Sequence, residues 1–167
     1  MSMLDLYHGG EAPVFAPRPE SPEATRPLDF GGGFYTTTSL DQARKWIAIR
    51  IRQRRYDFGC VSHFQIDQAV LVNAGLKVKR FATADSEWFD FVMDNRHTFG
   101  FEHDYDIVMG PVANDNVYET LTLFEDGTIS KPEAIARLKA YKLVDQLLFH
   151  TPRSLEFLKF IDSEETR

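Results

Sequence analysis

The sequence predicts a single α+β domain over residues 1–167. Strand-like and helix-like segments are intermixed without the regular strand–helix–strand repeat of a doubly wound sheet. The glycines Gly31 to Gly33 precede a strand-like stretch instead of joining a strand to a helix, which argues against a Rossmann-type dinucleotide fold. A chain of 167 residues fits one domain with a sizeable core, and 14 phenylalanines supply bulky core side chains.

The N-terminal part predicts two short strands and one helix. Residues 4–7 alternate like a strand, and residues 11–27, which hold five prolines, indicate an extended surface loop. Residues 34–38 are β-branched and aromatic, and predict the second strand. A capping-box pattern at Ser39 predicts a helix that runs to about Arg55, with apolar positions at helical spacing.

The middle of the chain adds strands and a second helix. Strand-like segments cover residues 60–66 and 69–72. Residues 86–92 predict a helix that ends around residues 95–97. Residues 105–109 predict a buried strand, which the following Gly-Pro pair stops.

The C-terminal part is less regular. Residues 114–125 are ambiguous, with a helix favoured. A capping box at Ser130 predicts a helix to about Tyr141, with a proline tolerated in its first turn. Residues 146–150 and 157–161 predict the last two strands.

Composition excludes several classes of protein. The net charge of −6 weakens the case for a general nucleic-acid binder, which usually has a strong basic excess. No apolar run approaches the roughly 20 residues of a membrane span, and no signal peptide is recognisable. The single cysteine, Cys60, cannot form an internal disulfide, and the five histidines lack metal-ligand spacing. We therefore expect a cytoplasmic protein that binds no metal and no membrane.

Basic residues nevertheless crowd into residues 44–55. The favoured interpretation is a solvated helix face. The alternative is an anion site for a pyrophosphate or a charged macromolecule, for which Arg44, Arg50 and Arg52 are the phosphate-binding candidates.

Two short motifs point to a ligand site. The first is Tyr7-His8-Gly9, where an imidazole stands beside a backbone that a ligand can approach closely. The second runs from Gly31 through Gly33 to Tyr35, and Trp46 follows eleven residues later. Two such rings can hold a flat cationic heterocycle such as nicotinamide. Taken alone, the histidine is more often structural and the aromatic residues are more often part of a core.

Together the two motifs resemble those of the ADP-ribosyltransferase superfamily, in its diphtheria-toxin and poly(ADP-ribose) polymerase branch. The whole chain also looks like a family of short uncharacterised bacterial proteins placed in that superfamily. The resemblance implies two small antiparallel β-sheets that form an NAD cleft, with flanking helices. The residues that it assigns to NAD are Tyr7, His8, Gly9, Gly33, Tyr35 and Trp46.

The resemblance also implies individual roles. His8 would hydrogen-bond the ribose on the nicotinamide side, and the backbone of Gly9 would hold the carboxamide. Tyr35 and Trp46 would sandwich the nicotinamide ring. The catalytic set implied in this way is His8, Tyr35 and Gln146.

Gln146 is the main departure from the superfamily, because a late strand of these proteins begins with a catalytic glutamate. A glutamine can hydrogen-bond a ribose hydroxyl, but it brings no negative charge and cannot act as a base. Losing that charge removes on the order of several kcal/mol of transition-state stabilisation. Period-two alternation places His150 on the same strand face as Gln146, as a second candidate.

Three further polar residues are candidates for the site. Asp115, next to Asn114, offers a carboxylate that would replace the missing glutamate, although an Asx turn or helix cap is the favoured interpretation. Arg96 would clamp a phosphate, although an arginine at a helix end is usually a partner of the helix dipole.

The resemblance implies an NAD-dependent mono-ADP-ribosyltransferase that acts on an acceptor, which is a protein or a nucleic acid. It also implies a bacterial toxin or defence effector opposed by an antitoxin protein. The alternative is a catalytically weak or inactive module of the same fold that binds NAD or ADP-ribose.

Overall fold

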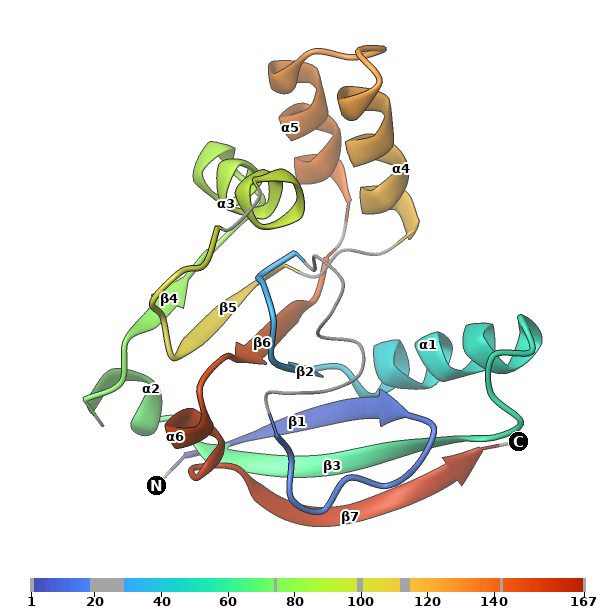
Figure 1. Cartoon of the computed structure of the whole chain (residues 1–167), viewed down its shortest axis with the longest axis vertical. Helices are drawn as coiled ribbons and strands as arrows, with labels where there is room; N and C mark the ends of the chain where they lie inside the picture. Colours follow the sequence, from blue (N-terminus) through green and yellow to red (C-terminus); the bar gives the residue numbers. More distant parts are fainter. Residues whose placement is uncertain are drawn as a thin grey trace.

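The computed structural model describes residues 2–18, 29–73, 75–98, 101–111, 115–141 and 143–166. Within these residues the strands are β1 (Met3–Gly10), β2 (Phe34–Thr37), β3 (Gly59–Asp67), β4 (Val78–Arg80), β5 (Ile107–Pro111), β6 (Asp145–Phe149) and β7 (Lys159–Thr166) (Figure 1). The helices are α1 (Leu40–Arg52), α2 (Val70–Asn73), α3 (Ser86–His97), α4 (Asp115–Glu125), α5 (Lys131–Ala140) and α6 (Pro152–Leu155). Helices and strands alternate irregularly, as predicted for an α+β protein.

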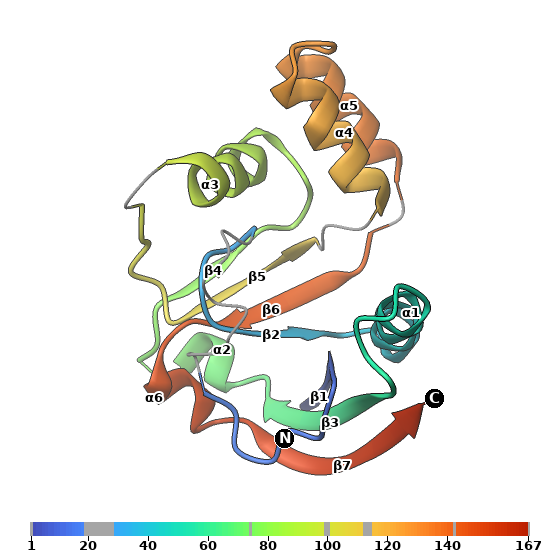
Figure 2. The ribbon, with the colours of Figure 1, turned by 45° about the vertical axis from the view of Figure 1, so that its right-hand side comes forward.

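The strands form one mixed seven-stranded sheet in the order β4-β5-β6-β2-β1-β3-β7, in which only β4 and β5 run parallel among the described residues. The prediction of two separate sheets is therefore wrong. In the described residues β1 pairs with β2 only at Tyr7 and Thr37, whereas β1 pairs with β3 along its whole length. Figure 2 shows β1, β3 and β7 turning away from the plane of β2, β6 and β5. One sheet thus has two halves that separate beyond a single bridge.

One face of the β4–β5–β6–β2 half packs against three helices. Trp88 of α3, Leu121 of α4 and Leu138 of α5 are fully buried in one cluster. Val108 of β5 and Leu148 of β6 belong to the same cluster. Figure 1 shows these three helices together beside this half of the sheet. The N-terminal end of β6, at Asp145, therefore lies close to the start of α4 and the end of α5.

The opposite face and the underside of α1 carry two further clusters. Leu147 and Phe149 alternate with Leu148 along β6, so they point to the other face, where they pack with Phe34. Ala43 and Ile47 of α1 pack on β3 in the third cluster. The helix α1 is thereby fixed beside the bridge between β1 and β2.

The two predicted serine caps are present. Ser39 Oγ accepts a hydrogen bond from the Gln42 N–H at 3.1 Å, and Ser130 Oγ accepts one from the Glu133 N–H at 3.3 Å. Each bond satisfies a backbone donor that the first turn of a helix leaves unpaired. The helix α1 ends a few residues earlier than predicted, where Arg54 adopts a left-handed φ of 58°.

Other predicted boundaries are wrong. Residues 69–72 fall in the turn and the helix α2, in which Leu71 N–H bonds back to the Gln68 carbonyl at 3.1 Å. The strand β5 begins at Ile107, because the Tyr105 N–H is taken by a side chain, and it continues through Gly110 and Pro111. Pro111 is tolerated there because it forms the last pair of the β5–β6 ladder.

Three other predictions fall at the C-terminal half. The ambiguous segment 114–125 is a helix from Asp115 onward, and Asn114 lies outside the described residues. The strand β6 ends at Phe149, so His150 follows the strand instead of belonging to it. The last strand, β7, starts two residues later than residue 157, because residues 156–158 follow the short helix α6.

Candidate functional site

A pocket of about 210 Å³ lies where β1 and β2 separate, and we call it the split-strand pocket. Its described walls come from β1, β2, β6, α1 and α4, with Asp29 added from the segment before β2. Six of the lining residues are candidates that the sequence assigns to NAD or catalysis. They are Tyr7, His8, Gly9, Tyr35, Trp46 and Gln146. Four segments that are far apart in the sequence thus meet at one cavity.

The strand register brings Gln146 close to β1. Thr37 of β2 pairs with Tyr7 on one side and with Gln146 of β6 on the other. Directly opposed residues on neighbouring strands point to the same face of a sheet. Tyr7, Thr37 and Gln146 therefore form a row across three strands, and all three line the pocket. Gln146 is only 7% exposed, so its amide is a buried polar group of the pocket wall.

The side chain of His8 joins β1 to β2 at the place where the two strands separate. Its Nδ1 lies 2.7 Å from the carbonyl oxygen of Tyr35, and its ring stacks on Phe34 with centroids 4.3 Å apart. A carbonyl oxygen only accepts, so Nδ1 carries the proton and donates it. In the neutral ring Nε2 is then the acceptor nitrogen. The hydrogen bond and the stacking contact thus orient the imidazole in the pocket wall.

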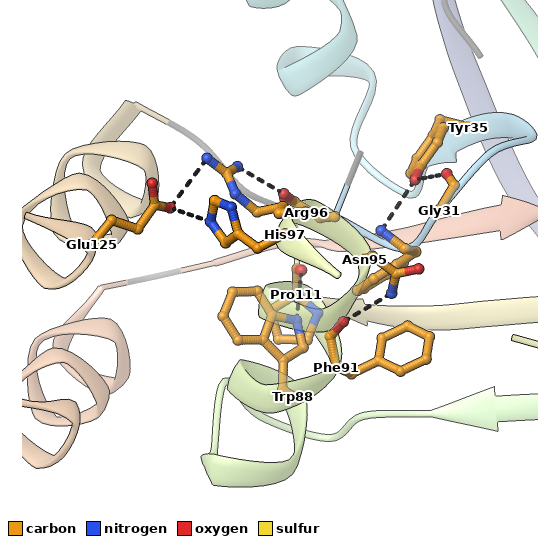
Figure 3. Close-up of polar contacts among 11 residues, drawn as sticks. Gly31, Tyr35, Trp88, Phe91, Asn95, Arg96, His97, Pro111 and Glu125 are labelled. Atoms are coloured by element: carbon orange, nitrogen blue, oxygen red, sulfur yellow. Dashed lines mark hydrogen bonds and ion pairs between the residues drawn. The ribbon is translucent and has the colours of Figure 1, made fainter. Parts of the chain in front are cut away.

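Tyr35 is held by its hydroxyl group. The hydroxyl donates to the carbonyl oxygen of Gly31 and accepts from the Phe30 N–H at 3.1 Å (Figure 3). Burial raises the pKa of Tyr35 well above its ordinary value, with the charge of Asp29 adding to the effect. The hydroxyl therefore stays neutral, and the anchored side chain lines the pocket.

Trp46 lies across the pocket on α1. Its ring has an edge contact with Tyr56 at 6.0 Å, and the guanidinium of Arg50 lies over it at 4.7 Å from the ring centroid. Arg50 also lines the pocket, whereas Arg44 forms two hydrogen bonds with Glu164, at 2.6 and 2.8 Å. Of these two arginines, Arg50 is the one placed to meet an anionic ligand.

The two glycine candidates differ in position. Gly9 lines the pocket, and a Cβ there would lie 3.1 Å from Ile47, so the glycine lets β1 pack closely on α1. Gly33 is not among the lining residues. It has a φ of +143°, and a Cβ there would lie 2.5 Å from the Phe149 carbonyl oxygen. The described role of Gly33 is therefore the close approach of β2 to β6.

His150 and Arg96 lie behind the pocket wall, not in it. His150 Nδ1 donates to the Gly32 carbonyl oxygen at 2.6 Å, so it holds the glycine segment, Gly31 to Gly33. Arg96 Nη1 lies 3.3 Å from Asp29 Oδ1, and Nη2 lies 3.4 Å from Glu125 Oε1. Figure 3 shows the Arg96 guanidinium reaching towards Glu125, with His97 beside it. Arg96 thus pairs with carboxylates instead of facing solvent as a helix-end charge.

The candidates at the start of α4 are not placed at the site. Asn114 is outside the described residues, and Asp115 is described only as the first residue of α4. From the same helix, Tyr118 reaches the pocket, with the Arg96 guanidinium 5.6 Å from its ring centroid.

Sequence reasoning missed six lining residues: Asp29, Thr36, Thr37, Gln42, Ala43 and Tyr118. Gln42 had a usable signal, since positions 42, 46 and 50 lie on one face of a helix. Tyr118 had none, because its place depends on how α4 packs. Asp29 stands two positions before Gly31 and is 5% exposed. Burial raises the pKa of Asp29, and the neighbouring Arg96 only partly offsets this.

Other kinds of site find no support in the described part of the chain. No group of three or more His, Cys, Asp or Glu side chains in these residues is arranged to hold a metal ion. Among the same residues, no helix has the length and apolar character needed to cross a membrane.

No curated protein and no solved structure significantly matches the chain. A family model does match, over residues 4–160, which include the whole split-strand pocket. The chain therefore belongs to the family described as "Protein of unknown function (DUF3990)".

Proposed function

We propose that this protein is an NAD-dependent mono-ADP-ribosyltransferase with an ADP-ribosyltransferase-like fold, and that NAD binds in the split-strand pocket. The observation that carries the proposal is the convergence of His8, Tyr35, Trp46 and Gln146 on one cavity. The superfamily resemblance rests on these residues as sequence positions, without any knowledge of the fold. Their meeting at a single pocket supports a shared ligand.

The size and charge of the pocket suggest which part of NAD it holds. A volume of about 210 Å³ is below the roughly 300–1,000 Å³ that is typical of pockets for drug-sized ligands. We therefore place the nicotinamide and its ribose inside, against Tyr35 and Trp46, and the adenosine end outside. Arg50 at the Trp46 ring is then placed to meet the pyrophosphate.

The reaction begins with cleavage of the bond between C1′ of the ribose and the nicotinamide nitrogen. Nicotinamide leaves with the electron pair of that bond, and an electrophilic ribosyl centre remains. His8 Nε2 accepts a hydrogen bond from a ribose hydroxyl, and the buried Gln146 amide orients a second one. Fixing the ribose in this way lowers the entropic part of the barrier.

The test is release of nicotinamide from NAD by the purified full-length chain, followed by chromatography. We expect His8→Ala to reduce the rate about 100-fold, a typical loss for one positioned polar group. His97→Ala is the matched control, since His97 is exposed on α3 and lies outside the pocket lining. A wild-type chain that binds no NAD would rule out the proposed function.

One observation favours a second candidate, a module that binds NAD or ADP-ribose with little or no turnover. Gln146 brings no charge to the wall in which a glutamate is expected. Calorimetric binding of NAD without nicotinamide release on long incubation would establish this candidate. A Gln146→Glu variant that gained NAD hydrolysis would then locate the reactive carbon beside β6.

For the acceptor we propose a protein or a nucleic acid, and for regulation an antitoxin protein that covers the cleft. Labelled NAD incubated with the protein and a cell lysate would identify the acceptor class. Label removed by protease indicates a protein acceptor, and label removed by nuclease indicates a nucleic acid.

A further inference from the structure

Asp29 carries the only acidic side chain among the described residues that line the split-strand pocket. It lines the same pocket as Gln146, yet it comes from the other end of the chain, where Phe30 separates it from the glycines Gly31 to Gly33. Asp29 is 5% exposed, so its carboxylate is inside the protein and not on the rim.

The backbone that follows Asp29 is fixed at three successive carbonyl groups. The Phe30 carbonyl oxygen accepts from His103 Nε2 at 2.7 Å, and the Gly32 carbonyl oxygen accepts from His150 Nδ1 at 2.6 Å. Between them, the Gly31 carbonyl oxygen accepts from the Tyr35 hydroxyl. This degree of attachment is what a preorganised charged group at a reaction centre requires.

The carboxylate itself is only partly paired. In the described part of the chain its one partner is Arg96, whose Nη1 lies 3.3 Å from Oδ1. Arg96 is shared with Glu125, and its buried Nε has no hydrogen-bond partner in the described structure. An ionised carboxylate accepts up to about four hydrogen bonds, and burying one that lacks them is unfavourable. The raised pKa of Asp29, caused chiefly by burial, reflects that cost.

We propose that Asp29 supplies, within the same pocket, the negative charge that Gln146 cannot supply. The inference rests on the proposed transferase function. As the bond between C1′ and nicotinamide breaks, the Asp29 carboxylate stabilises the positive charge that develops on the ribosyl carbon. The acceptor oxygen or nitrogen then bonds to C1′, its proton passes to Asp29, and Asp29 releases that proton to solvent.

The competing explanation is that Asp29 exists only to neutralise Arg96. The two explanations differ in what a second charge would do. If negative charge at the ribose is the contribution of Asp29, a carboxylate placed at position 146 restores the rate in a chain that lacks Asp29. If neutralisation of Arg96 is the only contribution, the carboxylate at position 146 restores nothing, because Gln146 has no described bond to Arg96.

The experiment compares nicotinamide release and NAD affinity for the wild type, Asp29→Asn and the double variant Asp29→Asn/Gln146→Glu. We expect Asp29→Asn to lose about 100-fold in rate with little change in Kd, and the double variant to regain at least about tenfold. Asp90→Asn, which removes an exposed ion pair between Asp90 of α3 and Lys131 of α5, is the control and keeps the wild-type rate.

Thermal unfolding distinguishes loss of the charge from loss of the fold. Because burial disfavours the ionised carboxylate, Asp29→Asn is expected to unfold at the wild-type temperature or above it. Equal turnover by the wild type and Asp29→Asn would overturn the Asp29 inference and leave the transferase intact. A wild type that binds NAD without releasing nicotinamide would contradict the transferase itself. If Asp29→Asn does not fold, the pH dependence of nicotinamide release by Arg96→Gln decides. The Arg96 charge lowers the pKa of Asp29, so removing it must shift the loss of activity at low pH to a higher pH. An unshifted pH dependence would contradict the inference.

Discussion

The imidazole of His8 donates through Nδ1 to the carbonyl oxygen of Tyr35, 2.7 Å away, across the gap that opens between β1 and β2. Beyond the bridge at Tyr7 and Thr37 no further described pair joins these two strands. The His8 side chain thus connects β1 to β2 where backbone pairing between them ends. His8 and Tyr35 both line the pocket at this place, so the bond also ties two of its walls together.

Replacing His8 should therefore affect both stability and ligand binding. Loss of its partly buried hydrogen bond is expected to lower the free energy of unfolding by about 1 kcal/mol. NAD affinity should fall as well, because the acceptor Nε2 is lost together with the bond between the two strands. Denaturant unfolding and calorimetry on His8→Ala measure the two effects. An unchanged NAD affinity would show that His8 serves only the fold.

Arg50 and Arg44 make a matched pair on α1. Arg50 lies over Trp46 in the pocket, whereas Arg44 is bonded to Glu164. We expect Arg50→Ala to weaken NAD binding about tenfold or more by removing a charge-assisted phosphate contact, and to leave the binding of free nicotinamide nearly unchanged. Arg44→Ala should leave both unchanged. Calorimetry with the two ligands checks this, and equal losses for both arginines would contradict the assignment of Arg50.

Local sequence patterns predicted the longer helices α1, α3, α4 and α5, because caps and periodicity are short-range properties, but they missed the four-residue helices α2 and α6. The serine caps at Ser39 and Ser130 illustrate this. The boundary of β5 was missed because the His103 side chain takes the backbone N–H of Tyr105, a local contact that the strand-like composition of residues 105–109 does not reveal. The single sheet was missed for a different reason, since one long-range strand pair, Tyr7 with Thr37, decides between one sheet and two.

The residues of the candidate site likewise divide into those that the sequence predicted and those that it did not. His8, Tyr35 and Gln146 sit in motifs whose spacing is visible in the sequence, and the pocket contains all of them. Asp29 and Tyr118 could not be placed, because neither has a local pattern and both reach the pocket only through packing of distant segments.

Gly33 was expected to contact NAD, but its geometry predicts a structural effect. A Cβ there would lie 2.5 Å from the Phe149 carbonyl oxygen, at a φ of +143°. Gly33→Ala should destabilise the protein by about 3 kcal/mol or more, since a clash adds to backbone strain. Gly127→Ala is the control: its φ is +82°, but nothing lies within 4 Å of the added Cβ, so only the strain of about 1 kcal/mol remains. Chemical denaturation of both variants tests the difference, and equal losses would argue against the clash.

Asp106 predicts how stability depends on pH. Burial alone would raise the pKa of this carboxyl, but hydrogen bonds from Thr151 and Lys77 and the charge of Arg153 outweigh burial, so the pKa is lowered. A lowered pKa means that the ionised form stabilises the fold above the ordinary aspartate pKa of 3.8, and that this contribution disappears as the pH falls through the folded value.

Asp106→Asn should then lose about 2 kcal/mol at pH 7, or roughly 4–8 °C in Tm, because a buried charge-assisted network loses its charge. The difference between wild type and variant should shrink as the pH falls below about 4, where the wild-type carboxyl also becomes neutral. Asp104→Asn provides the comparison, since Asp104 is exposed and paired only with Lys77 among the described residues, and a surface pair contributes little. Thermal melts of the three proteins between pH 3 and 7 measure these differences. A gap between wild type and Asp106→Asn that stays constant over this range would show that the network stabilises the fold by its shape and not by its charge.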